Sequence, residues 1–232
     1  MTRAVLKKDL AVLWASPLPY VVGALLHRAL GLLYIDQLEV RRQAVIQPLF
    51  PLAGFLLLVM VPLVTMRAFA EEARTGTLDV LQAVPVPARV LVLGKWLAAW
   101  ITTAIVFAPA LLFVVLLAWY GDPDAGPVVA GFLGLLLFTG ALTAVGVLAS
   151  AVTSSQPVAA IIALFVALLF WFADLGDDAP QAGSVLLRFS LRERLRSFAS
   201  GVVDTADIAF FVLLLAGALV LAGQAIAGRR LR

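Results

Sequence analysis

Long stretches without a formal charge alternate with short charged clusters along this 232-residue chain. Residues 43–66, 96–121, 125–173 and 208–228 contain no Asp, Glu, Lys or Arg. The stretches are continuous runs rich in Leu, Val, Ala and Phe rather than alternating polar and apolar residues, which favours helices over strands. A helix needs about 20 such residues to cross the hydrocarbon core of a membrane. The pattern therefore predicts an all-α integral membrane protein.

The number of spans follows from where these stretches break. The stretch 125–173 is too long for one crossing at about 1.5 Å per residue, and its polar centre, 153–157, divides it in two. A further span at 17–35 is unusual because it contains His27 and Arg28. We therefore predict six transmembrane helices, at residues 17–35, 48–66, 96–120, 127–152, 157–173 and 207–228.

The composition limits the class of protein. Hydrophobic residues make up 63% of the chain and charged residues 13%, whereas soluble proteins average about 45–50% and about 25%. A soluble enzyme is therefore disfavoured. Six spans and their loops account for the chain as a single membrane domain, which leaves no room for an ATPase domain. The absence of cysteine excludes cysteine-ligated metals and disulfides, and we expect no metal site.

Basic residues are unevenly divided between the two ends of the predicted spans. With the N-terminus in the cytoplasm, ten of the 17 Lys and Arg residues lie at the inner ends and six at the outer ends. Cytoplasmic loops carry such an excess of Lys and Arg, so we expect both termini in the cytoplasm. The basic pI near 9.7 reflects this excess at the inner ends, and we expect no nucleic-acid partner.

The loop between the second and third predicted spans, residues 67–95, has the most distinctive pattern. The charged residues from Arg67 to Arg74 are expected to extend the second helix into the cytoplasm. Gly76 is expected to end that helix, and Thr77 to cap a new one.

The predicted short helix has an apolar ridge formed by Leu78 and Leu81, and Pro85 closes it. In one interpretation this helix lies along the membrane face and docks into a groove on another protein. In the alternative, it is a solvated loop that packs on its own bundle. The residues of the docking interpretation are Glu71, Glu72, Arg74, Gly76, Thr77, Leu78, Leu81 and Pro85.

This loop resembles that of the permease subunits of type-2 ABC exporters, and most closely the gliding-motility permease family. The resemblance rests on the run Glu71-Glu72-x-Arg74-x-Gly76-Thr77-Leu78-x-x-Leu81, then Pro85-Val86 and Val92-Leu93-Gly94-Lys95. It extends to Ser16-Pro17, Gly121-Asp122-Pro123 and Ser197-Phe198-x-x-Gly201-Val202-Val203-Asp204. The chain departs from the pattern at Ala199 and Ser200, where a serine and a basic residue are expected.

The resemblance implies an architecture and a set of partners. Such permeases have six transmembrane helices, an N-terminal elbow helix (here residues 2–14), a cytoplasmic coupling helix and a small extracytoplasmic helical element (here residues 183–204). They dimerise with a second copy or a sibling permease and bind two ABC ATPase subunits per complex. Membrane lipid and an extracytoplasmic accessory protein are further implied partners. The implied location is the plasma (inner) membrane of a bacterium or archaeon, and the implied role is efflux.

ATP chemistry is expected to come from the partner. The chain has no G-x-x-x-x-G-K-[ST] run, because Gly94-Lys95 stands alone before Trp96. We therefore expect a non-catalytic subunit that binds no cofactor itself, with ATP and Mg²⁺ held by the ATPase. The alternatives are a secondary transporter or a non-transporting membrane anchor for an ATPase.

His27 and Arg28 are polar and charged residues within the first predicted span. A charged side chain at mid-span costs on the order of 2.5–3.5 kcal/mol, so it is expected to face a cavity or a partner. In one interpretation, the pair marks the translocation path and Arg28 binds an anionic group. In the other, the span is shifted, and Arg28 snorkels to the interface or caps carbonyls at a dimer contact.

A basic amphipathic helix is predicted on the outer side, before the last span. Arg188, Arg192 and Arg196 recur every four residues beside an apolar face formed by Leu187, Leu191, Leu195 and Phe198. One interpretation places the arginines on lipid phosphates at the interface. The other makes them an exit-side contact for an anionic substrate or an extracytoplasmic partner.

Small residues and prolines predict close packing and kinks within the bundle. Gly146 and Ser150 have the small-xxx-small spacing that lets helices approach closely. Pro62 and Pro109 are expected to kink the second and third helices.

Overall fold

The computed structural model describes residues 2–40, 45–77, 87–121, 123–174 and 187–229. These residues form helices, and no strand occurs among them. The α-helices are α1 (Thr2–Ala15), α2 (Leu18–Ile35), α3 (Leu49–Thr65), α4 (Ala70–Thr75), α6 (Ala88–Phe107), α7 (Leu111–Tyr120), α8 (Ala125–Val152), α9 (Gln156–Trp171), α10 (Leu191–Ala199) and α11 (Thr205–Arg229).

Within the described ranges, five helical segments are long and apolar enough to cross a membrane, in agreement with the prediction of an all-α membrane protein. The segments are Leu18–Glu39, Leu49–Thr75, Ala88–Trp119, Ala125–Val152 and Thr205–Arg229. The sixth predicted span corresponds to α9, which is apolar but has only 16 residues. Its crossing of the membrane stays a prediction.

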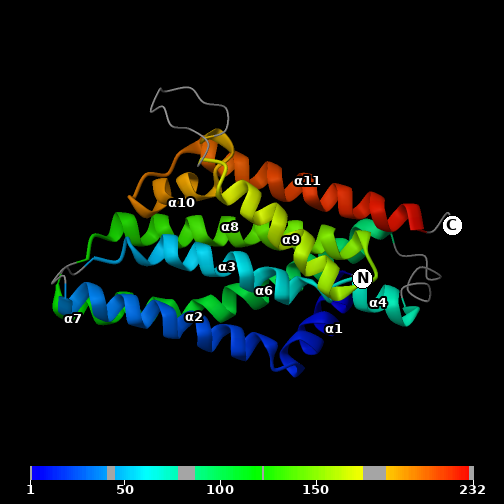
Figure 1. Cartoon of the computed structure of the whole chain (residues 1–232), viewed down its shortest axis with the longest axis horizontal. Helices are drawn as coiled ribbons and strands as arrows, with labels where there is room; N and C mark the ends of the chain where they lie inside the picture. Colours follow the sequence, from blue (N-terminus) through cyan, green and yellow to red (C-terminus); the bar gives the residue numbers. More distant parts are fainter. Residues whose placement is uncertain (1, 41–44, 78–86, 122, 175–186, 230–232) are drawn as a thin grey trace.

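The long helices run roughly along one axis and form a bundle around α8 (Figure 1). α8 packs against α3, α6, α9, α10 and α11. α1, α4 and the C-terminal end of α11 lie at one end of the bundle, and α7 lies at the other. The first and last described residues, Thr2 and Arg229, therefore lie toward the same end of the molecule. We call it the inner end, because the charge pattern predicts that it faces the cytoplasm.

Gly146 explains how closely α8 approaches α3. A Cβ atom at Gly146 would collide with the side chain of Thr65 at the end of α3. One turn further along α8, the Ser150 hydroxyl contacts the backbone immediately after α3. The predicted role of these small residues in helix packing is confirmed.

The helix that contains the third predicted span begins before that span. We expected it to start at Trp96, with residues 67–95 as a loop, but α6 begins at Ala88, directly after Pro87. The prediction treated the charge of Lys95 as a boundary, whereas ion pairs neutralise Lys95 inside the helix. At the far end, a 3₁₀ turn at Ala108–Ala110 contains Pro109 and separates α6 from α7, as the predicted kink required.

The helix α10 on the outer side begins after the first residue of the predicted apolar face, Leu187. α10 begins at Leu191 because the Ser190 hydroxyl accepts a hydrogen bond from the Glu193 N–H and caps the helix. Leu191, Leu195 and Phe198 are buried, as the pattern predicted, and Leu187 lies in a preceding 3₁₀ turn, Leu187–Phe189.

Candidate functional site

The chain makes a tight break between α3 and α4 at the inner end of the bundle. The sequence predicted one continuous helix through the charged residues, but α3 ends at Thr65 and α4 begins at Ala70. The hydroxyl of Ser150 on α8 fills the break. It accepts hydrogen bonds from the N–H groups of Phe69 (2.9 Å) and Ala70 (3.0 Å) and donates one to the carbonyl of Met66 (3.0 Å). A side chain from another helix thus replaces part of the missing helical hydrogen bonding.

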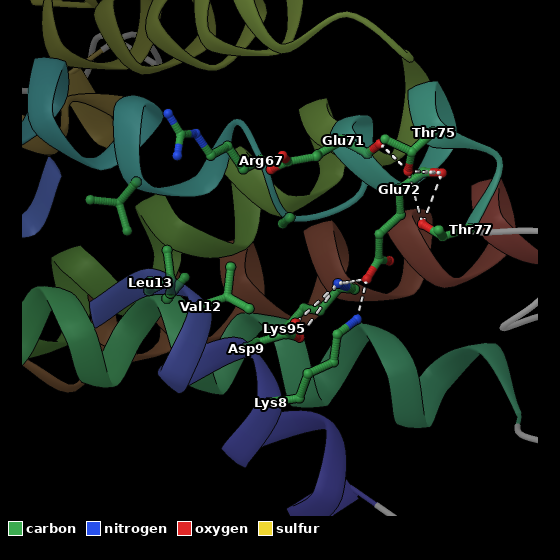
Figure 2. Close-up of a pocket in the computed structure, with 13 residues that line it drawn as sticks. Lys8, Asp9, Val12, Leu13, Arg67, Glu71, Glu72, Thr75, Thr77 and Lys95 are labelled. Atoms are coloured by element: carbon green, nitrogen blue, oxygen red, sulfur yellow. Dashed lines mark hydrogen bonds and ion pairs between the residues drawn. The ribbon is translucent and has the colours of Figure 1, made fainter. Parts of the chain in front are cut away.

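Four charged side chains join α1, α4 and α6 beside this break (Figure 2). The Lys95 Nζ lies 2.9 Å from Glu72 Oε1 and 3.4 Å from Asp9 Oδ2. The Lys8 Nζ shares the same Glu72 oxygen at 2.8 Å. We call these residues, Lys8, Asp9, Glu72 and Lys95, the inner ion network.

Lys95 is the centre of the inner ion network. Its side chain is only 4% exposed, and its ammonium lies 5.1 Å from the ring centroid of the buried Phe69. A lysine so deeply buried is stable only when opposite charges and an aromatic face replace its lost hydration. The network therefore fixes α4 to two other helices through one ammonium group.

Burial changes the proton affinity of the network. Burial raises the pKa of Asp9 above its usual value near 3.8, and Lys95 offsets this effect only in part. Burial alone would lower the pKa of Lys8, but the hydrogen bond and the charge of Glu72 raise it. Asp9 lies in α1, outside the candidate spans.

The raised pKa of Asp9 predicts a pH dependence of stability. The folded chain binds this proton more tightly than the unfolded chain, so stability falls as pH rises from about 4 through the raised pKa. Thermal unfolding is measured in detergent for the wild type and Asp9→Asn. As pH rises above about 4, the unfolding temperature of the wild type is expected to fall relative to that of the variant. A rise relative to the variant would contradict the assignment.

A cavity of about 250 Å³ lies beside the inner ion network. Val12, Leu13 and Val64 form part of its apolar side, and Arg67 and Glu71 add charges that are not part of the network. Figure 2 shows the Arg67 side chain extending away from the network. The Arg67 Nε is buried and has no hydrogen-bond partner in the described structure.

The predicted docking residues lie together only in part. Glu71, Glu72 and Arg74 belong to α4, and Gly76 ends that helix with a left-handed φ of 72°, as predicted. The carboxylate of Glu72 points inward to Lys8 and Lys95, whereas Arg74 is exposed. The Thr77 hydroxyl lies 3.0 Å from that of Thr75. Leu78, Leu81 and Pro85 lie outside the described residues.

Sequence reasoning missed three of the four members of the inner ion network and also Ser150 as a hydrogen-bonding group. Asp9 and Lys95 are far apart in the sequence, and no spacing rule connects them. The available signal was the position of Lys95 in a helical, otherwise apolar segment, which demands a buried counter-charge.

His27 and Arg28 point in different directions from α2. The His27 Nδ1 lies 2.8 Å from the carbonyl oxygen of Gly23, so it bonds within its own helix. Arg28 is exposed, whereas Leu26 and Leu30 pack into the bundle. Arg28 thus faces outward from this single copy of the chain, and its role stays a prediction.

The three predicted outer arginines differ in their surroundings. Arg188 and Arg196 are exposed, while Arg192 forms a 2.8 Å ion pair with Asp174. The sequence pattern overlooked Arg194, which pairs with Asp207 at the start of α11 at 2.6 Å and lies over the ring of Phe210. Arg192 and Arg194 therefore help to fix the outer element to the bundle, and the lipid contact of the other two stays a prediction.

Comparison with known families decides the class of this membrane protein. A family described as ABC-2 family transporter protein matches residues 33–177, which include the α3–α4 break, Lys95 and Ser150. The chain belongs to the ABC-2 family. No match was found among curated proteins. As an ABC-2 permease, the chain is a membrane transport subunit of an ABC transporter rather than an enzyme, and its general partner is an ABC ATPase.

Proposed function

We propose that this ABC-2 permease is the membrane-spanning subunit of an ATP-driven exporter close to the gliding-motility permeases. In this proposal it has six transmembrane helices with α1 as the elbow helix, both termini are cytoplasmic, and the membrane is a bacterial or archaeal plasma membrane. It dimerises with a second copy or a sibling permease and binds two ATPase subunits, which hold ATP and Mg²⁺.

The observation that carries this proposal is the rigid connection of α4 to the bundle. The inner ion network ties α4 to α1 and α6, and Ser150 ties the start of α4 to α8. A segment that contacts an ATPase must pass its displacement to the transmembrane helices without deforming. The buried ion pairs and the Ser150 hydroxyl hold α4 to the packed bundle. Packed cores shift between discrete arrangements rather than bending continuously, so a displacement of α4 would be passed to the helices it contacts.

The predicted ATPase contact lies beyond this anchored segment. Gly76 ends α4 with a left-handed φ of 72°. In the proposal, residues 76–86 are the coupling helix, and Leu78 and Leu81 enter a groove on the ATPase. Glu72 is occupied within the chain and Glu71 lines the cavity beside the inner ion network, so the exposed Arg74 is the charged residue of the contact.

A pull-down tests the coupling assignment. The permease is co-expressed with the ABC ATPase encoded beside its gene, and the variants are Leu78→Trp with Leu81→Trp, and Arg74→Glu. Both are expected to reduce the recovered ATPase by about tenfold or more, because hot-spot residues carry most of the binding energy of an interface. The control is Arg3→Glu, an exposed charge reversal on α1. Full ATPase recovery with both variants would contradict the proposal.

A further inference from the structure

We propose that the cavity beside the inner ion network binds the headgroup of a zwitterionic phospholipid with a primary ammonium, of the phosphoethanolamine type. This inference goes beyond the proposed function and does not depend on it. The cavity of about 250 Å³ is smaller than the usual range of about 300–1,000 Å³ for drug-sized ligands. It therefore suits a headgroup and the beginning of an acyl chain rather than a whole cargo molecule.

The charges of the cavity select the ligand class. Lys8, Asp9, Glu72 and Lys95 neutralise one another in the inner ion network. Arg67 and Glu71 line the same cavity, and neither side chain forms an ion pair or hydrogen bond in the described part of the chain. Among the described residues, the cavity thus offers one cation and one anion without an ion-pair partner, which matches a zwitterion.

The break between α3 and α4 keeps Arg67 and Glu71 apart. Residues four apart in a continuous helix are neighbours and commonly pair. Here residues 66–69 leave the helical path, with Ser150 bonded to Met66, Phe69 and Ala70. Arg67 therefore precedes the break and Glu71 follows it, and a ligand with both charges can bind between them.

The chemistry assigns each charge of the ligand. A guanidinium binds phosphate through two parallel N–H···O bonds, and the buried Nε of Arg67 lacks a hydrogen-bond partner among the described residues. The carboxylate of Glu71 would accept hydrogen bonds from a primary ammonium. An anionic headgroup without an ammonium leaves Glu71 uncompensated, and a trimethylammonium cannot donate a hydrogen bond to it.

The position of the cavity fits a lipid. Arg67 lies two residues beyond the apolar helix α3, where a membrane span reaches the headgroups. Val12, Leu13 and Val64 give the cavity an apolar side, suited to the first carbons of an acyl chain. In Figure 2, Val12, Leu13 and Arg67 are drawn on the same side of the inner ion network.

Binding of short-chain lipids to the purified full-length chain tests this proposal. Dioctanoyl phosphatidylethanolamine, phosphatidylglycerol and phosphatidylcholine are titrated in detergent and measured by calorimetry. Phosphatidylethanolamine is expected to bind at least about tenfold more tightly than the other two, which corresponds to about 1.4 kcal/mol. Arg67→Gln is expected to weaken its binding by about tenfold or more. Glu71→Gln is expected to remove the preference over phosphatidylglycerol.

Control variants test whether the lipid binds in this cavity, and soluble headgroups test whether the ligand must be a lipid. Arg3→Gln and Glu39→Gln remove exposed charges outside the cavity and are expected to bind as wild type does. Val12→Trp narrows the cavity from an exposed position and is expected to weaken binding even where Arg67→Gln fails to fold. Equal binding of phosphatidylglycerol, or unchanged binding in Val12→Trp, would overturn the proposal. Inorganic phosphate or soluble phosphoethanolamine that binds as tightly as the lipid would overturn the lipid assignment.

Discussion

Replacing Lys95 with methionine is expected to destabilise the inner end of the bundle by about 3–5 kcal/mol, because it breaks a buried charge arrangement by removing one partner. Methionine fills a similar volume but leaves the carboxylate of Asp9 without its cation. The side chains of Asp9 and Glu72 are 14% and 12% exposed, so water replaces the lost ammonium poorly. α4 would also lose its connection to α6.

The measurements for Lys95→Met are thermal unfolding in detergent and ATP hydrolysis by the assembled complex. The matched control is Lys8→Met, which removes the other ammonium bound to Glu72. The Lys8 side chain is 54% exposed, so its loss is expected to cost at most about 1 kcal/mol. Equal destabilisation by Lys95→Met and Lys8→Met would contradict the prediction that the buried lysine contributes more to stability than the exposed one.

Replacing Ser150 with alanine is expected to cost about 2–5 kcal/mol. One hydroxyl serves the N–H groups of Phe69 and Ala70 and the carbonyl of Met66, and each buried group left without a partner costs about 1–3 kcal/mol. The start of α4 would then be free to move relative to α8. The rate of transport-coupled ATP hydrolysis is expected to fall even at temperatures where the variant is still folded. The lower unfolding temperature alone would not explain this loss.

Ser200→Ala is the control for the Ser150 variant. The Ser200 hydroxyl is exposed and bonds to the Ser197 carbonyl within its own turn, at 2.7 Å. Its removal is expected to change stability by less than about 0.5 kcal/mol, as is usual at surface positions. Equal unfolding temperatures for the two variants would refute the bridging role of Ser150.

Helix identity and several helix boundaries were accessible from the sequence. Continuous apolar runs predict membrane-spanning helices, because a helix satisfies its own backbone hydrogen-bonding groups inside a membrane. Gly76 and Pro109 mark the end of α4 and the kink after α6, because glycine adopts a left-handed φ and proline lacks an N–H. These are local properties, and local sequence determines them.

The start of the third helix illustrates the opposite case. A charge predicts the boundary of a span, so the sequence places Lys95 in a loop. In the structure, the helix continues through Lys95 because Glu72 and Asp9, from other parts of the chain, lie within 4 Å of its ammonium. The cost of burying a charge depends on its neighbours, and neighbours from distant segments are not visible in a linear pattern.

The sequence by itself determined that the chain is a helical membrane protein with an excess of positive charge toward one end, because lengths, hydropathy and charge counts belong to each segment separately. Only the tertiary structure decided where the second helix breaks and which charges neutralise one another. Ser150 reaches that break from α8, some 80 positions along the chain, and Asp9 and Lys95 are 86 apart. Such contacts form because helix packing brings distant residues within a few ångströms, and the same packing leaves Arg67 and Glu71 at the cavity without an ion pair among the described residues.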